Sequence, residues 1–398
     1  MARKDLGGKR EQDEFSLLLS PSRGIADDDP TSLKNPEIQE RFRDHIAGKL
    51  KKWSIAHPFG TYSSDPKRKN EELGIILLDL RKLREGIHSI RRIDTFACEV
   101  YEASVLLSLL ASNQAQLLSS LPHLVTVIHP TLAQDDLSTS LSTLSVAQTT
   151  PPSRPPPSQA TRSFYLTLHL LHSHLLPAFT NPTSSPSSTS SSSSPPLTNF
   201  LHTLLSLLTL SSLPHPPLLR PGLFPFSTQP SPPTDPSITF LLSLHIALIR
   251  TSLPKISSLL DSRNLPVPPS ELTSHFKSLL SLSNRSAPNP LAILLRGSVP
   301  SLREEWFKSV VGKAFRFPPD QKEWLSKWFL FEFEVKVERE LGLVETGKGS
   351  GEGKRKDSSD SWDEKEDEDE EEEEGEKWVR EEAERRVVDF IERKRGQR

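Results

Sequence analysis

Two amphipathic helical patterns follow one another almost directly between Leu73 and Leu110, and they limit the possible folds more than any other part of the chain. In the first pattern, apolar residues recur at alternating steps of four and three, which places on one helix face Ile76, Leu80, Leu83, Ile87 and Ile90. The second pattern follows Arg91 and Arg92 and is formed by Ile93, Phe96, Val100, Leu107 and Leu110. Asp94 or Thr95 is available as the N-cap of the second helix. Because so short a connection joins the two patterns, we predict an antiparallel helix pair.

This stretch contains the string REGIHSIRRIDTFACEVYEAS, which resembles a signature of the GANP-like, or SAC-three, family of PCI-domain proteins. The residues that carry the resemblance are Leu83, Arg84, Ile87, Arg92, Ile93, Phe96, Glu99, Val100, Tyr101 and Glu102. Two later segments are also similar to the family. SITFLLSLHIALIRTSLPKISSLL resembles its later helix pair, and AILLRGSVPSLREEWFKSVVGKAFRFP resembles the approach to its winged-helix end.

The resemblance implies an all-α fold, in which a helical-repeat (TPR-like) array is followed by a small winged-helix subdomain to form a PCI domain. It also implies a non-catalytic scaffold subunit of a multiprotein complex, in nuclear mRNA processing or export or in transcription-coupled RNA handling. In such scaffolds the array presents one long surface and the winged helix pairs with a second PCI subunit. The partners implied are therefore other protein subunits, with RNA as a further candidate and no small-molecule substrate.

Two alternatives come from other classes. Proteasome-lid and translation-initiation-factor subunits share the PCI fold, so the chain could belong to one of those complexes instead. A membrane-associated helical protein is suggested by two uncharged, leucine-rich segments, FYLTLHLLHSHLLPAF and NFLHTLLSLLTLSSL. Both are shorter than the roughly twenty apolar residues that a membrane span needs, and both contain histidine or several hydroxyl groups. We therefore expect no membrane association.

Composition agrees with a protein of the nucleus or cytosol. Of the 398 residues only 34% are hydrophobic and 35 are proline, so much of the chain is not expected to be core. The single cysteine, Cys98, excludes a disulfide framework within the chain and fits a reducing compartment. The first residues, MARKDLGGKREQDEF, are charged and lack the apolar stretch of a secretory signal. We expect a nuclear location, with a cytoplasmic one also open.

Shifts in composition predict the domain organisation. Residues 1–70 are expected to be a mostly disordered basic region with one short helix at about 37–53. The apolar residues of this helix are spaced by four, at Ile38, Phe42, Ile46 and Leu50. Residues 71–345 are expected to form the helical array and the winged helix. Proline- and serine-rich insertions, which cannot form helix interiors, interrupt them near 146–160, 181–196 and 211–236.

The apolar segments between these insertions are predicted to be helices. They are 114–128, 162–176, 197–210, 237–251 and 272–282. After the array, residues 346–376 are expected to form a disordered acidic linker, since the run DEKEDEDEEEEEGE repels itself. Residues 377–398 are then expected to form an amphipathic helix, which docks either on its own domain or in a groove of a partner. Its apolar side is formed by Trp378, Ala383, Val387, Phe390 and Ile391.

The segment 329–341 gives two conflicting signals. Its apolar residues alternate with polar ones, as in a strand, but its second half is rich in residues that favour helices. The family comparison also starts a helix near Glu332, so we predict a helix. Trp324, Trp328 and Phe329 are expected to be core residues rather than nucleic-acid stacking residues.

Basic residues gather in the first quarter of the chain and form a candidate nucleic-acid patch. They are Lys49, Lys51, Lys52, Lys67, Arg68, Lys69, Arg81, Lys82, Arg84 and Arg91, with Arg92 beside them. We favour a solvated helix face, because local carboxylates such as Asp79 and Glu85 can pair with them and aromatic residues are sparse. The runs PKRKN and GKRKD are candidate nuclear-import signals.

No motif predicts catalysis, a cofactor or a metal. His169 and His172 lie about one helical turn apart and His174 is close by, but that segment has no carboxylate and Cys98 belongs to another helix. The segment from Gly342 to Gly349 approaches a phosphate-binding loop, yet it has glycine where the magnesium-binding hydroxyl belongs, and the residues after it do not favour a helix. The G-x-S-x-G turn of serine hydrolases does not occur. We therefore predict a non-enzyme.

Overall fold

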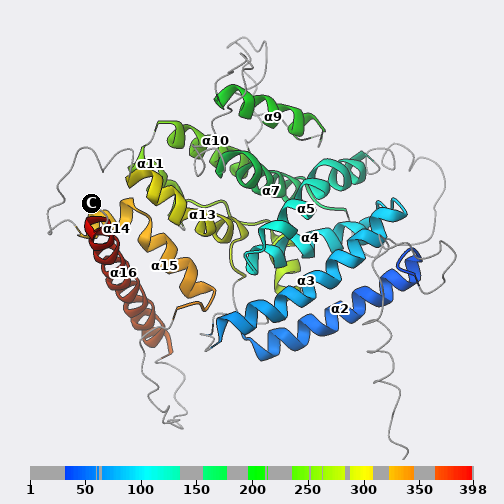
Figure 1. The fold of residues 1–398 in the computed structure, drawn as a ribbon, viewed down its shortest axis with the longest axis horizontal. Coiled ribbons are helices and arrows are strands. Elements are labelled where there is room, and N and C mark those ends of the chain that lie inside the picture. The colour runs from blue at the N-terminus through cyan, green and yellow to red at the C-terminus, as the bar shows by residue number, and fades with distance from the viewer. Residues whose placement is uncertain are drawn as a thin grey trace, which may run out of the picture. The chain divides into compact units, whose positions relative to one another are not determined.

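The structure of this chain is a computed structural model, which describes residues 32–59, 61, 65–134, 156–176, 196–210, 213, 235–250, 252–261, 263–282, 287–307, 322–344 and 364–396. Every regular element within these residues is a helix, so the all-α class is confirmed (Figure 1). Most of the proline- and serine-rich insertions predicted near 146–160, 181–196 and 211–236 lie outside the described residues, as do the first 31 residues.

The chain divides into two compact units, which we describe separately. Unit 1 comprises Met1–Pro58, Asp65–Leu242 and Pro266–Leu294, and unit 2 comprises Phe59–Ser64, Ser243–Leu265 and Leu295–Arg398. Two helices contribute residues to both units: α10 (Pro236–Ile249) and α13 (Pro290–Trp306).

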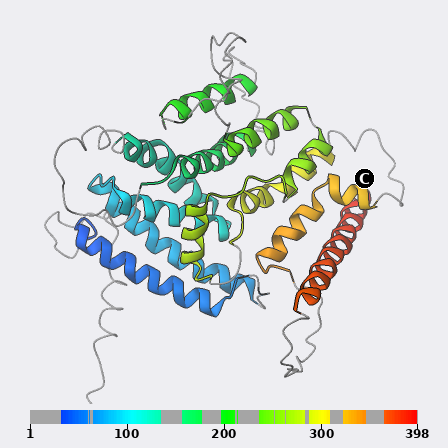
Figure 2. The same cartoon turned by 180° about the vertical axis from the view of Figure 1, so that it is seen from behind.

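Unit 1 consists of helices, and those from α2 to α5 each pack on the next one along the chain. Its helices are α2 (Pro36–Ala56), α3 (Pro66–Ser89), α4 (Thr95–Leu110), α5 (Gln114–His123), η2 (Leu124–Ile128), α7 (Gln159–Leu170), η3 (Leu171–Leu175), α9 (Pro196–Leu210) and α12 (Ser270–Leu279). Helix α2 packs against α3, α3 against α4, and α4 against α5 (Figures 1 and 2). Helix α12 returns from much later in the chain to contact both α2 and α4. The helix predicted at 37–53, the two helices of the predicted hairpin and the helices at 114–128, 162–176, 197–210, 237–251 and 272–282 are confirmed, with α10 ending at Ile249 and α12 at Leu279.

Side-chain caps start α2, α3 and α4. Asn35, Asp65 and Asp94 each accept a hydrogen bond from a backbone N–H of the first turn, at 3.0, 3.0 and 2.8 Å. Of the two cap candidates for α4, the structure therefore uses Asp94. Arg91 has a φ of 53°, which turns the chain sharply between α3 and α4.

The predicted apolar faces form the core of this hairpin. Buried residues include most of those in the two patterns, namely Ile76, Leu80, Leu83, Ile87, Phe96, Val100 and Leu107. In α2, the residues that face the core are Gln39, Phe42, Ile46, Leu50 and Trp53. Ile38, which we assigned to that face, is only half-buried, since the face begins at Gln39 instead.

Two helices of unit 1 change from α- to π-helical hydrogen bonding. Segment η2 follows α5 directly, two residues after Pro122, and η3 follows α7. Proline has no amide hydrogen to donate to the helix ladder, and π-segments often lie where that ladder is disturbed. Because a π-turn holds an extra residue, the residues after it face a different direction from the one that a regular α-helix would give them.

Unit 2 contains α11 (Leu253–Leu260), α14 (Lys322–Trp328), α15 (Phe331–Glu340) and α16 (Glu364–Gly396). The segment 329–341 is therefore helical, which confirms the helix prediction, and its strand-like alternation was misleading. The aromatic residue Phe329 is buried as predicted. The side chains of Trp324 and Trp328 lie outside the described residues.

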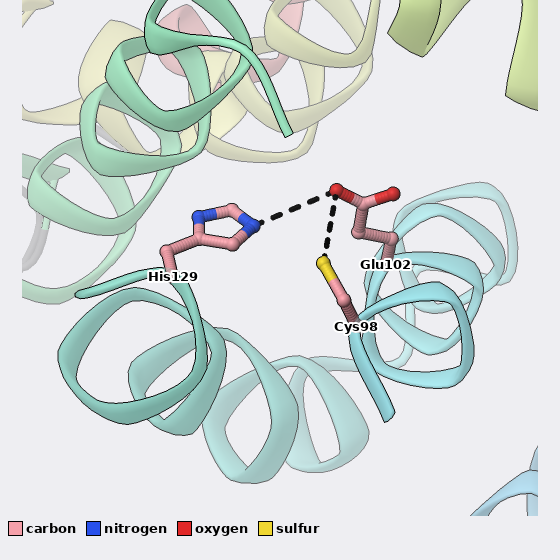
Figure 3. Close-up of side chains that lie close together, drawn as sticks. All are labelled: Cys98, Glu102 and His129. Carbon is pink, nitrogen blue, oxygen red and sulfur yellow. Dashed lines mark hydrogen bonds and ion pairs between the residues drawn. The ribbon is translucent and has the colours of Figure 1, made fainter. Parts of the chain in front are cut away.

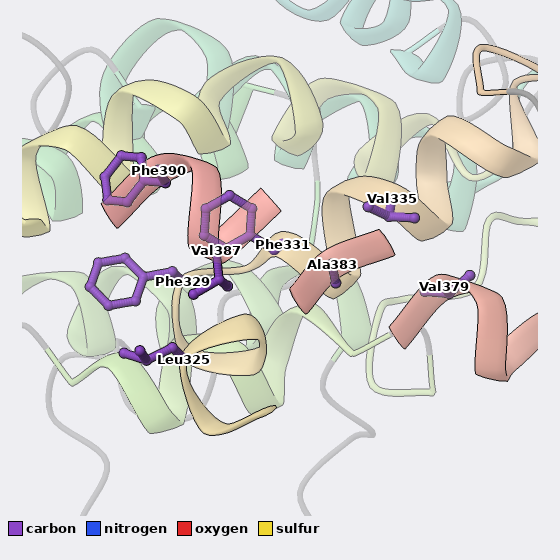
Figure 4. Packing of buried hydrophobic residues seen from close by; sticks show 8 residues of the cluster. All are labelled: Leu325, Phe329, Phe331, Val335, Val379, Ala383, Val387 and Phe390. Atoms are coloured by element: carbon purple, nitrogen blue, oxygen red, sulfur yellow. The ribbon is translucent and has the colours of Figure 1, made fainter. Parts of the chain in front are cut away.

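Helix α16 packs on α14 and α15 and completes the core of unit 2 (Figure 4). This core is formed by Leu325, Phe329, Phe331, Val335, Val379, Ala383, Val387 and Phe390, with Phe307, Trp378 and Ile391 beside them. Of the two uses predicted for the C-terminal helix, the structure shows docking on its own chain. The helix begins at Glu364 and so includes part of the segment that we expected to be an acidic linker.

Candidate functional site

The signature residues lie on α3, on α4 and in the turn between them, and their polar side chains connect this hairpin to neighbouring helices. Arg92 lies just before α4. Its guanidinium donates to Asp94 Oδ2 at 2.6 Å and to Gln39 Oε1 of α2 at 3.2 Å, and it lies 3.3 Å from Glu40. It also lies over the ring of Phe96, with 4.1 Å from Cζ to the ring centroid. Arg92 thus joins α2 to the start of α4.

Arg84 makes an equivalent connection between α3 and α5. Its guanidinium donates to Gln116 Oε1 at 2.6 Å and to Ser119 Oγ at 3.1 Å, and it lies 5.6 Å from the ring centroid of Tyr101 on α4. The side chain is buried, and burial lowers the pKa of Arg84 while nearby Tyr101 opposes that shift. Neutral acceptors therefore hold a buried cation at this point of the stack.

The remaining signature residues are mainly packing residues. Leu83, Ile87, Phe96, Val100 and Tyr101 are buried, and Ile93 is half-buried. Glu99 lies 3.6 Å from Arg43 of α2.

Glu102 is the centre of a buried polar cluster between α4 and η2 (Figure 3). Only 1% of Glu102 is exposed. Its Oε1 accepts a hydrogen bond from Cys98 Sγ, one turn earlier on α4, at 3.6 Å. The same oxygen lies 3.5 Å from Nε2 of His129, which follows η2. Its other oxygen, Oε2, lies 3.3 Å from Nδ1 of His275 on α12. One carboxylate therefore meets side chains from three parts of the unit.

The charge on Glu102 depends on these neighbours. Burial by itself raises the pKa of a carboxyl group, but His129 and His275 more than offset that effect, so the pKa of Glu102 lies well below its usual range. Glu102 is therefore a carboxylate at neutral pH. A buried carboxylate destabilises a protein unless polar groups face it, and here a ring nitrogen of each histidine lies 3.5 or 3.3 Å from one of its oxygens.

His129 is as deeply buried as the carboxylate that it faces. Only 1% of it is exposed, and its ring packs edge-on against Tyr165 of α7 at 5.5 Å. Neither ring nitrogen forms a hydrogen bond of normal geometry. Together with Cys98 and Glu102, His129 brings one sulfur, one oxygen and one nitrogen within 4.8 Å of one another, a set that could hold a metal ion.

The histidines that the sequence singled out lie elsewhere. His169 is buried on α7, and its ring centroid lies 6.0 Å from that of His174. Burial lowers the pKa of His169 to about 4, helped by His174 and His172 nearby. The Nε2 atom of His172 forms a hydrogen bond with Oε1 of Gln114, at 2.6 Å. These residues belong to no metal-ligand group among the described residues.

Much of the candidate nucleic-acid patch is paired with carboxylates or buried. Asp79 accepts from Lys49 at 2.7 Å and lies 3.7 Å from Lys82. Lys69 and Arg84 are buried. The other pairs along α3 are Lys67–Glu71, Arg68–Glu72 and Arg81–Glu85.

Lys51, Lys52 and Arg91 are the exposed members of the patch for which no ion pair is described. Lys51 and Lys52 lie on α2 and Arg91 lies at the turn after α3. Because Lys69 and Arg84 are buried, the ten residues do not all lie on an exposed surface. RNA binding by this region stays a prediction. The candidate import signal at 66–70 forms the first turn of α3 and includes buried Lys69, whereas GKRKD and most of Gly342–Gly349 lie outside the described residues.

Sequence reasoning missed His129 and His275 as partners of Glu102. Cys98 and Glu102 are four residues apart, which is a helical spacing and was visible in the sequence. His129 stands alone in the string VIHPTL and His275 alone in LTSHFK, so neither had a local signal. Their approach to Glu102 results from helix packing alone.

Comparison with known proteins gives no independent guide to function. No family model matches the chain, and neither a curated protein nor a solved structure matches it. Among the described residues, no helix combines the length and the apolarity required to cross a membrane.

Proposed function

We propose that this chain is a scaffold subunit of a multiprotein complex that handles nuclear mRNA, in its processing or its export. The observation that carries the proposal is the position of the signature residues. Arg84, Arg92 and Glu102 each connect the α3–α4 hairpin to a different neighbouring helix. The residues that carry the resemblance to a scaffold family thus connect neighbouring helices, which is the arrangement expected of residues that stabilise a scaffold.

The exposed face of α3 is evidence for a protein partner rather than for RNA. Ile75 and Leu78, which lie three residues apart on one side of this helix, are 56% and 53% exposed. The basic side chains of the same helix largely pair with carboxylates or are buried. An apolar strip among neutralised charges is better suited to an apolar protein surface than to a phosphate backbone.

The assignment of a PCI domain, with a winged helix at its end, is part of the same proposal. A PCI domain would end in a winged helix, and we propose α11, α14 and α15 of unit 2 as the candidates for its helical part. None of the described residues forms a strand, so the strands of a wing are not seen among them. The nuclear location and the pairing with a second PCI subunit are likewise proposed from the resemblance.

The test is affinity purification of the tagged full chain from nuclear extract, with identification of the bound subunits by mass spectrometry. We expect subunits of an mRNA-processing or export complex, including a second PCI protein. Recovery of proteasome-lid or translation-initiation subunits would replace the proposal with the alternative, and recovery of no stable partner would contradict both.

A matched pair of variants examines the role of α3. The double variant Ile75→Glu with Leu78→Glu should reduce partner recovery at least about tenfold, since charged groups would have to be buried in the interface. Val267→Glu is the control, because Val267 is 83% exposed and lies outside α3. Far-UV circular dichroism should show unchanged helicity in both. Equal recovery with the double variant and the control would exclude this face.

A further inference from the structure

We propose that Cys98, Glu102 and His129 form a buried binding site for a divalent transition-metal ion, with Zn²⁺ as the best-suited metal (Figure 3). His275 would act as the residue that positions the carboxylate. This inference goes beyond the proposed scaffold function and does not depend on it.

The donor set is the first argument. Zn²⁺ is bound in proteins by thiolate sulfur, imidazole nitrogen and carboxylate oxygen, and a soft thiolate disfavours Ca²⁺ and Mg²⁺. Cys98 and Glu102 lie on one side of α4, four residues apart, and point toward the ring of His129 (Figure 3). Two ligands on consecutive turns of a helix, with a third from a neighbouring segment, are a usual way to build such a site.

The distances are the second argument. With Zn–S of about 2.3 Å and Zn–O or Zn–N of about 2.1 Å, tetrahedral angles separate sulfur from oxygen by about 3.6 Å and nitrogen from oxygen by about 3.4 Å. The observed separations are 3.6 Å from Cys98 Sγ to Glu102 Oε1 and 3.5 Å from His129 Nε2 to the same oxygen. An N–H···O hydrogen bond would be shorter, at about 2.9 Å. The side chains are therefore spaced like ligands of a common ion.

The buried imidazole is the third argument. His129 is 1% exposed, its Nε2 faces Glu102, and neither of its ring nitrogens has a hydrogen bond of normal geometry. Buried polar atoms normally have a partner, and an imidazole nitrogen without one is available to a metal. A bound ion would complete the coordination of that nitrogen.

His275 provides the outer support that metal sites require. Its Nδ1 lies 3.3 Å from Glu102 Oε2, the oxygen that does not face Cys98 and His129. A side chain on the far oxygen fixes the direction in which the carboxylate points, and such supports typically change metal affinity by 10- to 100-fold. When the metal binds, Cys98 becomes a thiolate and releases its proton to solvent, so binding should tighten as pH rises.

The first experiment uses the full chain, stripped with a chelator and titrated with Co²⁺ or Zn²⁺ alone. Co²⁺ bound by a thiolate gives a sulfur-to-metal charge-transfer band, and Cys98 is the only cysteine of the chain, so this band can report on no other residue. We expect the band to saturate at one Co²⁺ per chain and to disappear when Zn²⁺ is added. We also expect Zn²⁺ at one hundred times its Kd to raise Tm by at least about 5 °C.

Variants then separate the site from adventitious binding. Cys98→Ser should abolish the charge-transfer band and weaken Zn²⁺ binding at least about 100-fold. His275→Gln should weaken binding about tenfold while the band remains. His172→Gln is the control, because it removes a histidine of the other cluster, and it should leave Kd unchanged. Cobalt binding without a charge-transfer band in the unaltered protein would overturn the proposal, as would zinc binding that is lost with His172→Gln and kept with Cys98→Ser.

Discussion

At the scale of single residues, Gly86 shows how closely α3 approaches the turn before α2. A Cβ added at this glycine would lie 2.6 Å from the carbonyl oxygen of Leu33 and 2.9 Å from its Cβ. The same carbonyl accepts a hydrogen bond from the side-chain amide of Gln39 at 2.8 Å, and the oxygen of that amide accepts one from Arg92. The absence of a side chain at Gly86 therefore permits the contact on which this network depends.

We predict that Gly86→Ala destabilises the protein by about 1–3 kcal/mol, because backbone atoms of the Leu33 turn must move to make room for the methyl group. The control is Gly48→Ala in α2, where a Cβ would meet nothing within 4 Å. That change should be neutral or stabilise the protein by up to about 1 kcal/mol, since alanine favours a helix more than glycine does. Urea unfolding of the two variants measures both values. The same sign for both would contradict the close approach at Gly86.

At the scale of secondary-structure elements, α16 shows how a helix far along the chain completes a core. Its residue Phe390 contacts the rings of Phe307 and Phe331 edge-on, at centroid distances of 5.3 and 5.9 Å. Arg386 donates to Glu338 of α15 at 2.8 Å, and the other carboxylate oxygen of Glu338 accepts from Arg296 of α13 at the same distance. The helix is thus held by an apolar face and by an ion pair beside it.

We predict that Phe390→Ala lowers the free energy of unfolding of unit 2 by about 3–5 kcal/mol, because it leaves a cavity among aromatic rings. Hydrogen exchange followed by mass spectrometry should become faster in peptides from α14 and α15. Truncation after Gly375 should have a larger effect in the same peptides, since it removes every α16 residue of the cluster. Glu381→Ala is the control, because Glu381 is exposed on the same helix. Unchanged exchange in the Phe390 variant would show that α16 contributes little to this core.

At the scale of the whole molecule, buried histidines link stability to pH. Burial lowers the pKa of His169 in unit 1 to about 4, with a further contribution from His174 and His172, and burial also lowers the pKa of His245 in unit 2 to about 4. An unfolded histidine titrates near 6.5, so between about pH 6.5 and pH 4 the unfolded chain binds more protons than the folded one. These two histidines should therefore contribute no pH dependence above about pH 7, and stability should fall as the pH drops through this window.

We predict that His169 alone accounts for about 1–2 kcal/mol of the stability lost between pH 7 and pH 5. The loss should shrink by that amount in His169→Gln, which cannot titrate. His202→Gln should behave like the unaltered protein, because His202 is exposed on α9. Urea unfolding of the three proteins at both pH values, in the presence of a chelator so that metal binding does not contribute, gives the three losses of stability to be compared. An equal loss in the His169 variant and the unaltered protein would refute the assignment.

Local periodicity was sufficient to predict the helices and many of their buried faces. The α3–α4 hairpin, the helix of the first seventy residues and the apolar side of the C-terminal helix all follow from spacings of three and four residues. The prediction was least secure at 329–341, where alternation typical of a strand competed with helix propensity and the helix formed. Side chains can alternate in polarity over a short helix when its neighbours bury both sides, and α15 contacts both α14 and α16.

Periodicity alone determined most of the residues that face inward, because the backbone repeats regularly within one helix. Only the tertiary structure decided which inward residues meet. Cys98 and Glu102 are four residues apart, about one helical turn, which can be read from the sequence. His129 approaches them from the residues after a π-helical segment, and His275 approaches Glu102 from a helix much later in the chain. A π-turn rotates the residues that follow it, and long-range packing brings distant helices together. Both effects depend on the packed stack as a whole, so the buried cluster around Glu102 was not predicted from sequence.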